Sequence, residues 1–204
     1  MRATEFSPSI PSRPVYGGLR PHGALPALML AEGAGGEALA ELAKADSSVM
    51  RHAQLFYISS GAPAGPELAA RLRGLGPASY VEGPSWAALR PRFARALADA
   101  HMGIRLYLAG SEGLIGQAMA DALAAGLPLE AIDAEHHGGI ARRMQCVHCK
   151  GITENVTTDP FTCAHCGLNL FVRDHYSRRI GAFQGVCIDA ETPGIVPEPQ
   201  EIKP

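Results

Sequence analysis

Four cysteines in the last third of the chain have the spacing of a metal site. They form two Cys-x-x-Cys pairs, Cys146 with Cys149 and Cys163 with Cys166, separated by 13 residues. A Cys-x-x-Cys pair in a tight hairpin directs two thiolates to one point, and two such pairs complete a tetrahedral four-sulfur site. Gly167 follows the second pair, where a turn of this kind needs a positive φ. The sequence therefore predicts a metal-binding ribbon with these four cysteines as ligands.

The type of metal follows only in part from this ligand set. A closed set of four thiolates leaves no coordination position open for catalysis, so we expect structural zinc. A rubredoxin-like iron that carries one electron fits the same sulfur geometry, and the spacing does not separate the two metals. His148 and His165 lie inside the pairs, where side chains point outward, and are not expected to be ligands. Cys187 lies in an apolar run and is expected to be a small buried residue.

Two glycine-rich turns in the first two thirds of the chain have the composition of phosphate-binding loops. They are EGAGG at residues 32–36 and GSEG at residues 110–113. Glycines let backbone N–H groups approach a pyrophosphate, and a helix N-terminus favours its charge. Neither turn has the complete Gly-x-Gly-x-x-Gly pattern, so each also fits a simple tight turn. NAD(P)H is the candidate cofactor, and the candidate residues that would bind it are Gly33, Gly35, Gly36, Gly110, Glu112 and Gly113.

Residues 27–138 alternate apolar runs with amphipathic stretches, which indicates repeated strand–helix units. Such units build a parallel sheet with helices on both faces, and ligands bind at the carboxyl ends of its strands. The third expected helix contains Pro91, where we expect it to break or restart. The sequence therefore predicts an α/β fold, a small parallel-sheet domain followed by a small β ribbon. The expected strands are at 27–30, 54–58, 79–81, 105–109 and 129–134, and the expected helices at 37–45, 66–74, 86–100 and from the turn at 110–113 to 125.

Composition divides the chain into four parts. Residues 1–26 are rich in proline and glycine and are expected to form an extended arm. Residues 27–138 form the expected α/β domain, and residues 139–190 hold all five cysteines and form the metal ribbon. Residues 191–204 contain four prolines and are expected to be a mobile tail.

Charge and hydropathy exclude several classes of protein. Lys and Arg total 18 and Asp and Glu total 20, and this formal net charge of −2 argues against a nucleic-acid binder driven by charge. No apolar run reaches the length of a membrane span, and the first residues contain no apolar signal region. Paired cysteines without an export signal indicate the reducing cytoplasm. No Ser-His-Asp arrangement, Walker loop or paired-carboxylate motif is found, so no catalytic residue is predicted.

Residues 28–138 resemble the pyridine-nucleotide half of ferredoxin–NADP reductase-type enzymes. The closing stretch at 105–138, RLYLAGSEGLIGQAMADALAAGLPLEAIDAEHHG, carries most of this resemblance. Gly110 and Gly113 match the glycines of the Cys-Gly-Pro-x-Gly signature of that family, and Glu135 matches its terminal acid. The resemblance implies a nucleotide-binding type of fold.

The same stretch departs from the reductase pattern. Ala109 and Ser111 stand where the signature has cysteine and proline. Reductases of this type place a flavin-binding barrel before the nucleotide half, and only about 26 residues precede it here, too few for a barrel. We therefore expect the flavin to lie on another chain. This chain is expected either to complete that site as a nucleotide-binding subunit or to keep the fold as a docking scaffold.

The C-terminal third resembles the DmmA family of dimethylamine monooxygenase subunits. The most specific parts are VRDHYSRR at residues 172–179 and AFQGVC at residues 182–187, which follow the two cysteine pairs. The opening SRPVYGG at residues 12–18 also looks like that family. Together with the reductase-like middle, the resemblance covers all of the chain except its tail.

This resemblance implies a subunit of a multicomponent enzyme that demethylates dimethylamine to methylamine and formaldehyde with NAD(P)H and O₂. It implies that flavin, haem and iron–sulfur centres lie on partner chains and that this chain is not catalytic alone. We expect the α/β part to support a nucleotide or flavin site and the ribbon to be a docking module, with no nucleic acid and no membrane as partners. The alternatives are a rubredoxin-like electron carrier and a zinc ribbon that binds nucleic acid or protein, supported by the basic segment at residues 173–179.

Overall fold

The computed structural model describes residues 12–59 and 65–202. The chain divides into two compact units. One unit, Tyr16–Gly139, is called the α/β unit below. In the other, the residues up to Val15 join those from Ile140 onward, and this is called the ribbon unit.

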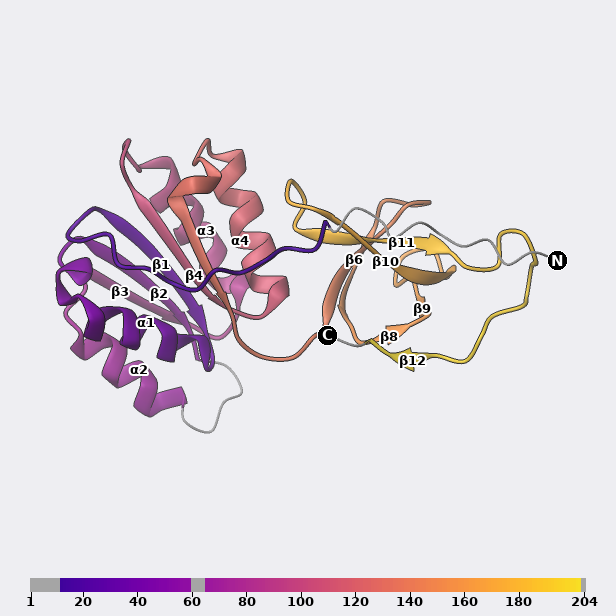
Figure 1. The fold of residues 1–204 in the computed structure, drawn as a ribbon, viewed down its shortest axis with the longest axis horizontal. Coiled ribbons are helices and arrows are strands. Elements are labelled where there is room, and N and C mark those ends of the chain that lie inside the picture. The colour runs from indigo at the N-terminus through magenta and orange to yellow at the C-terminus, as the bar shows by residue number, and fades with distance from the viewer. Residues whose placement is uncertain (1–11, 60–64, 203–204) are drawn as a thin grey trace. The chain divides into compact units, whose positions relative to one another are not determined.

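The α/β unit contains a five-stranded parallel sheet in the order β3-β2-β1-β4-β5 (Figure 1). This confirms the predicted α/β fold with a parallel sheet. The strand order reverses between β1 and β4, so the carboxyl ends of these two strands flank the topological switch point at which such sheets bind ligands. The strands are β1 (Ala27–Glu32), β2 (Ala53–Ile58), β3 (Ser79–Gly83), β4 (Arg105–Gly110) and β5 (Ile132–His136).

Helices cover both faces of this sheet, with α1 and α2 on one face and α3 and α4 on the other (Figure 1). Met29 and Tyr107 pack toward α1 and α2, while Leu28 and Leu106 pack toward α3 and α4. Strands buried on both faces are apolar throughout, which is why they appear in the sequence as continuous apolar runs. No helix in the described ranges is long and apolar enough to cross a membrane. The helices are α1 (Gly35–Ala45), α2 (Gly65–Gly74), α3 (Trp86–Ala98) and α4 (Glu112–Ala124), with short 3-10 turns η1 (Ser47–Met50) and η2 (Leu129–Ala131).

The third helix does not break at Pro91, so that prediction was wrong. The helix α3 runs without interruption from Trp86 to Ala98. Pro91 lies on its exposed side, whereas Leu89 and Phe93 are buried in the core beneath it. A proline inside a helix costs about 3 kcal/mol, and burying two large apolar side chains offsets a cost of this size.

The arm before β1 follows the edge strand β5. The N–H of Gly18 donates to the carbonyl of Ala134 at 3.1 Å, and the N–H of Leu19 donates to the carboxylate of Glu135 at 3.2 Å. Between residues 16 and 26 the arm contains no helix or strand. These bonds give it a defined course and cover part of an edge that would otherwise present unpaired backbone groups.

The ribbon unit is built on a second five-stranded sheet, in the order β7-β6-β11-β10-β9. All neighbours in it are antiparallel except β6 and β11. The hairpins β6–β7 and β9–β10 each carry one cysteine pair at their connecting turn, with Cys146 as the last residue of β6. The strands are β6 (Arg142–Cys146), β7 (Ile152–Val156), β8 (Thr158–Asp159), β9 (Phe161–Thr162), β10 (Asn169–Ser177), β11 (Ala182–Cys187) and β12 (Gln200–Glu201).

Ser12 fills an irregularity in β10. The register of β10 against β11 shifts between Arg173 and Tyr176. The Ser12 hydroxyl donates to the carbonyl of Asp174 at 2.6 Å and accepts from the N–H of Tyr176 at 2.9 Å. Ser12 therefore satisfies two backbone groups at the irregularity, and it joins two of the stretches that carry the family resemblance.

The end of the expected mobile tail has a defined place in the structure. Gln200 and Glu201 form β12, which pairs with β8. Ile202 is only 7% exposed and belongs to the core of the ribbon unit. A high proline content indicated a tail without structure, but one apolar side chain that reaches a core is enough to anchor such a segment.

Replacing Pro91 with alanine should stabilise the α/β unit. In Pro91→Ala the restored N–H can donate to the carbonyl one turn earlier, so we expect the free energy of unfolding to rise by about 1–3 kcal/mol. The matched control is Pro66→Ala in the first turn of α2, where no intrahelical bond is missing and no gain is expected. Urea unfolding measures both, and a Pro91→Ala variant no more stable than the parent would contradict the explanation given for α3.

Candidate metal centre

The two cysteine pairs lie in turns of the same geometry. In each turn the residue after the second cysteine has a positive φ, 63° at Lys150 and 74° at Gly167. Its N–H donates to the carbonyl of the first cysteine, at 2.9 Å in the first turn and 3.0 Å in the second. The N–H of each first cysteine in turn donates, at 2.9 Å, to the carbonyl two residues after the second cysteine. Gly167 was expected to have this conformation, and Lys150 takes it at the equivalent position without being glycine.

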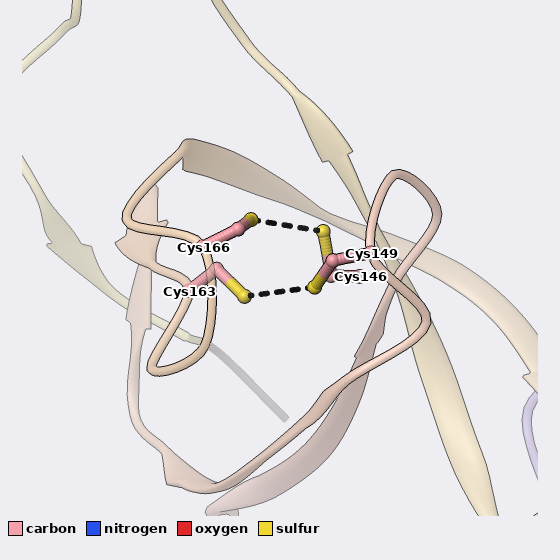
Figure 2. Close-up of side chains that lie close together, drawn as sticks. All are labelled: Cys146, Cys149, Cys163 and Cys166. Carbon is pink, nitrogen blue, oxygen red and sulfur yellow. Dashed lines mark hydrogen bonds between the residues drawn. The ribbon is translucent and has the colours of Figure 1, made fainter.

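The four sulfur atoms point toward one another from the two turns (Figure 2). The Sγ atoms of Cys146 and Cys166 are 3.9 Å apart, and those of Cys149 and Cys163 are 3.7 Å apart. All four lie within 4.8 Å of one another. In a tetrahedral site with metal–sulfur bonds of about 2.3 Å, neighbouring sulfurs are about 3.8 Å apart. The donor set and its spacing therefore fit one tetrahedral metal ion.

The close approach of the thiols shifts their proton affinities in opposite directions. Burial raises the pKa of Cys163, but hydrogen bonds from the backbone N–H groups of Cys166 and His165 and from neighbouring thiols outweigh it and lower the pKa to about 6. At Cys166 the backbone N–H of Leu168 lowers the pKa, but burial and the neighbouring thiols outweigh it and raise the pKa to about 12. Protons are thus unevenly shared in the cluster, and a bound cation would displace them.

Two of the four cysteines form part of the ribbon core. Cys146 is 1% exposed and Cys163 is 2% exposed, and both pack in the cluster that contains Met144, Leu170 and Phe183. Cys149 and Cys166 are exposed. The site therefore lies at the boundary between the core and the solvent, where an ion can enter and the two turns are joined.

The other candidate side chains near the cluster have separate roles. His165 Nε2 lies 2.8 Å from the carbonyl oxygen of Ile152, and His148 is exposed. The cluster of potential ligands among the described residues contains neither histidine. The thiol of Cys187 is half-buried and donates to Asp189 at 3.2 Å, and this bond, together with burial, raises its pKa.

The structure brings the predicted nucleotide residues to one end of the parallel sheet. Gly33 follows β1, and Gly35 and Gly36 are the first residues of α1. Gly110 is the last residue of β4, and Glu112 and Gly113 are the first residues of α4. Both turns flank the topological switch point, as a phosphate-binding site would require.

Packing within the chain explains two of these glycines. A Cβ atom on Gly35 would lie 2.3 Å from the carbonyl oxygen of Ala109 in β4. A Cβ atom on Gly36 would lie 2.9 Å from Leu68 and 3.0 Å from Tyr57. These glycines let α1 lie close to β4, β2 and α2, so their presence does not need a ligand. Binding of NAD(P)H at these turns stays a prediction.

Sequence reasoning missed a hydrogen bond at the same place. The carboxylate of Glu32, the last residue of β1, accepts from the hydroxyl of Ser111 at 2.6 Å. Glu32 and Ser111 belong to the glycine-rich turns at residues 32–36 and 110–113, but only the pairing of β1 with β4 places them side by side. The signal in the sequence was an acidic residue where a phosphate loop would have a neutral one.

Two family models match the chain. The model for the N-terminal domain of dimethylamine monooxygenase subunit DmmA-like proteins matches residues 8–132, and that for the C-terminal domain matches residues 143–186. The chain belongs to the DmmA-like family. The C-terminal match contains all four clustered cysteines of this DmmA-like chain, and the N-terminal match contains both glycine-rich turns. The predicted family resemblance is confirmed.

A curated relative and a solved structure are similar to parts of the DmmA-like chain. The heme-dependent oxidative N-demethylase delta subunit of Ectopseudomonas mendocina (strain ymp) is 39% identical over 110 residues. That alignment covers 54% of the DmmA-like chain and 63% of the relative, less than two thirds of its length. The flavohemoglobin of Malassezia yamatoensis with bound FAD and heme aligns with a TM-score of 0.39 and 14% identity, over 55% of this chain and 32% of that one. A likeness of this degree assigns no ligand to the DmmA-like chain.

Replacing one buried cysteine of the cluster should remove the metal and unfold the ribbon unit. In Cys163→Ser we expect the metal content to fall from one ion per chain to nearly none, because three thiolates hold the ion far less tightly than four. Limited proteolysis should then cut between residues 140 and 202 while the α/β unit resists. The control is Cys187→Ser, which lies outside the cluster and should keep the ion. Full metal content in Cys163→Ser would show that this ligand set is wrong.

Proposed function

We propose that this chain is a non-catalytic subunit of a multicomponent monooxygenase that removes a methyl group from dimethylamine, giving methylamine and formaldehyde with NAD(P)H and O₂. The observation that carries this proposal is the match of both DmmA-like domain models, one after the other along the chain. The relative named as a subunit of a heme-dependent oxidative N-demethylase supports the same class of reaction. The haem, flavin and iron–sulfur centres of that reaction are proposed to lie on partner subunits.

In this proposal the four cysteines hold one structural zinc ion. Cys146, Cys149, Cys163 and Cys166 would supply all four bonds, which leaves no position for a substrate or water. Bound zinc would contribute folding free energy by joining the two cysteine turns. An iron ion in the same site would instead make the chain a one-electron carrier, and a red protein with charge-transfer absorption would identify it.

The ribbon unit would also provide a docking surface. Arg173, Arg178 and Arg179 are exposed on β10 and on the turn that follows it. None of the three has a carboxylate within 4.0 Å among the described residues, whereas Arg142 and Arg143 pair with Asp174 and Glu154 at 2.8 Å. Exposed arginines without a carboxylate partner favour an acidic surface on a protein partner.

Activity of the assembled enzyme tests the role of the subunit. When the host complex is purified with and without this chain, we expect dimethylamine-dependent oxidation of NAD(P)H to require it. Addition of the separately purified chain should restore the activity, whereas the chain alone should oxidise no nicotinamide nucleotide. Full activity of a complex that lacks the chain, or turnover by the chain alone, would contradict the proposal.

Charge reversal tests the docking surface. In the double variant Arg178→Glu, Arg179→Glu we expect the affinity for the remaining complex to fall about 10- to 100-fold, with a weaker dependence on salt. The control variant, Arg51→Glu with Arg92→Glu, changes the charge equally at exposed positions of the α/β unit and should bind normally. Equal affinities of the two variants, or salt-sensitive binding of an oligonucleotide by the parent chain, would count against a protein-docking role.

A further inference from the structure

The carboxylate of Glu32 lies at the switch point between β1 and β4. Its Oε2 atom accepts from the Ser111 hydroxyl at 2.6 Å and lies 3.4 Å from the Ser111 backbone nitrogen, which donates to it. Ser111 is the N-cap of α4, and its hydroxyl oxygen also accepts from the N–H of Leu114 at 3.3 Å. A negative group of the chain itself thus occupies the N-terminus of the helix that follows β4.

A dinucleotide pyrophosphate would need the same place. Sheets of this order bind the pyrophosphate at the switch point, against a helix N-terminus that supplies N–H donors and a favourable dipole. A carboxylate at that position gains from the same donors and the same dipole. Glu32 therefore already accepts from the Ser111 hydroxyl and the Ser111 backbone N–H, two donors for which a phosphate at this place would compete.

The glycine at the end of β4 leaves space for Glu32. A Cβ atom on Gly110 would lie 3.0 Å from the Cβ of Glu32 and 3.1 Å from Leu114. In the other turn, the N–H of Gly33 donates to the carbonyl of Ile58 at 2.9 Å, and its carbonyl accepts from the Tyr57 hydroxyl at 3.1 Å. The space and these backbone groups are thus used within the chain.

The charges around this end of the sheet also disfavour a polyanion. Glu37 and Glu112 lie in the first turns of α1 and α4. The nearby cation Arg71 is already paired with Glu37, and Arg73 pairs with Glu82 near the end of β3 at 3.4 Å. The sequence carries no charged residue from 60 to 64, between β2 and α2. A pyrophosphate entering here would meet carboxylates without a free arginine or lysine among the described residues of these turns.

We propose that Glu32 is an internal substitute for the pyrophosphate and that the α/β unit binds no dinucleotide. The contact between Glu32 and Ser111 clamps the two glycine-rich turns together, so the unit keeps the reductase-like fold and serves as a scaffold. This replaces the expectation from sequence that the two turns bind NAD(P)H. It follows, if the proposed function holds, that the nicotinamide nucleotide binds on another subunit.

Calorimetry on the isolated full-length chain tests whether the α/β unit binds a dinucleotide. Titration with NADPH, NADH or inorganic pyrophosphate should give no saturable binding below about 1 mM. Binding of NADPH at micromolar concentration, competed by pyrophosphate, would overturn the proposal. Since this experiment uses no partner subunit, its outcome is independent of whether the demethylase assignment is correct.

A double-mutant cycle tests the clamp. Glu32→Ala should lower the melting temperature by roughly 2–6 °C, whereas the control Glu67→Ala, at an exposed position in α2, should change it by less than about 1 °C. Ser111→Ala loses both the clamp and the helix cap. The fall in melting temperature of the double variant Glu32→Ala, Ser111→Ala should therefore be smaller than the sum of the falls in the two single variants. The isosteric Glu32→Gln, which still accepts from Ser111, should retain most of the stability. A Glu32→Ala variant as stable as its control, or strictly additive losses, would refute the clamp.

Discussion

The ribbon unit depends on the convergence of four thiol groups within 4.8 Å. Four negative sulfurs at this distance repel one another, so they need either shared protons or a cation between them. Protons relieve the repulsion unevenly: burial and hydrogen bonds together place the pKa of Cys163 at about 6 and that of Cys166 at about 12. One divalent ion relieves it at all four sulfurs at once and also joins the β6–β7 turn to the β9–β10 turn. The remaining core of this unit is small, so the ion would be a main source of its stability.

The α/β unit is stabilised instead by the burial of apolar side chains. Its central strands are buried on both faces, and two apolar clusters hold the helices against the sheet. Its glycine-rich turns are filled by contacts within the chain: α1 packs against Ala109 through Gly35, and Glu32 bonds to Ser111. A fold that resembles a nucleotide domain can in this way be kept as a scaffold after the ligand position is taken by a side chain. In the proposed function the two units share one role, which is to present stable surfaces to the chains that carry the redox centres.

Most of the fold was predictable from the sequence because apolar runs and cysteine spacing are local signals. The four clustered cysteines, the parallel sheet and the positive φ of Gly167 all follow from such signals. The course of α3 through Pro91 was not predictable, because it depends on the burial of Leu89 and Phe93 in the tertiary structure. The contacts of Ser12 and of Glu32 join segments far apart in the chain, so no local pattern reveals them. The positive φ of Lys150 was not predictable either, because the turn geometry and not the residue type imposes it.

The central claim is that the four cysteines bind one structural zinc ion. Elemental analysis of the purified full-length chain, combined with native mass spectrometry, tests it most directly. We expect one zinc ion per chain and a colourless protein whose metal is lost together with the fold of the ribbon unit. A protein without bound metal, or a red protein that contains iron in place of zinc, would contradict it.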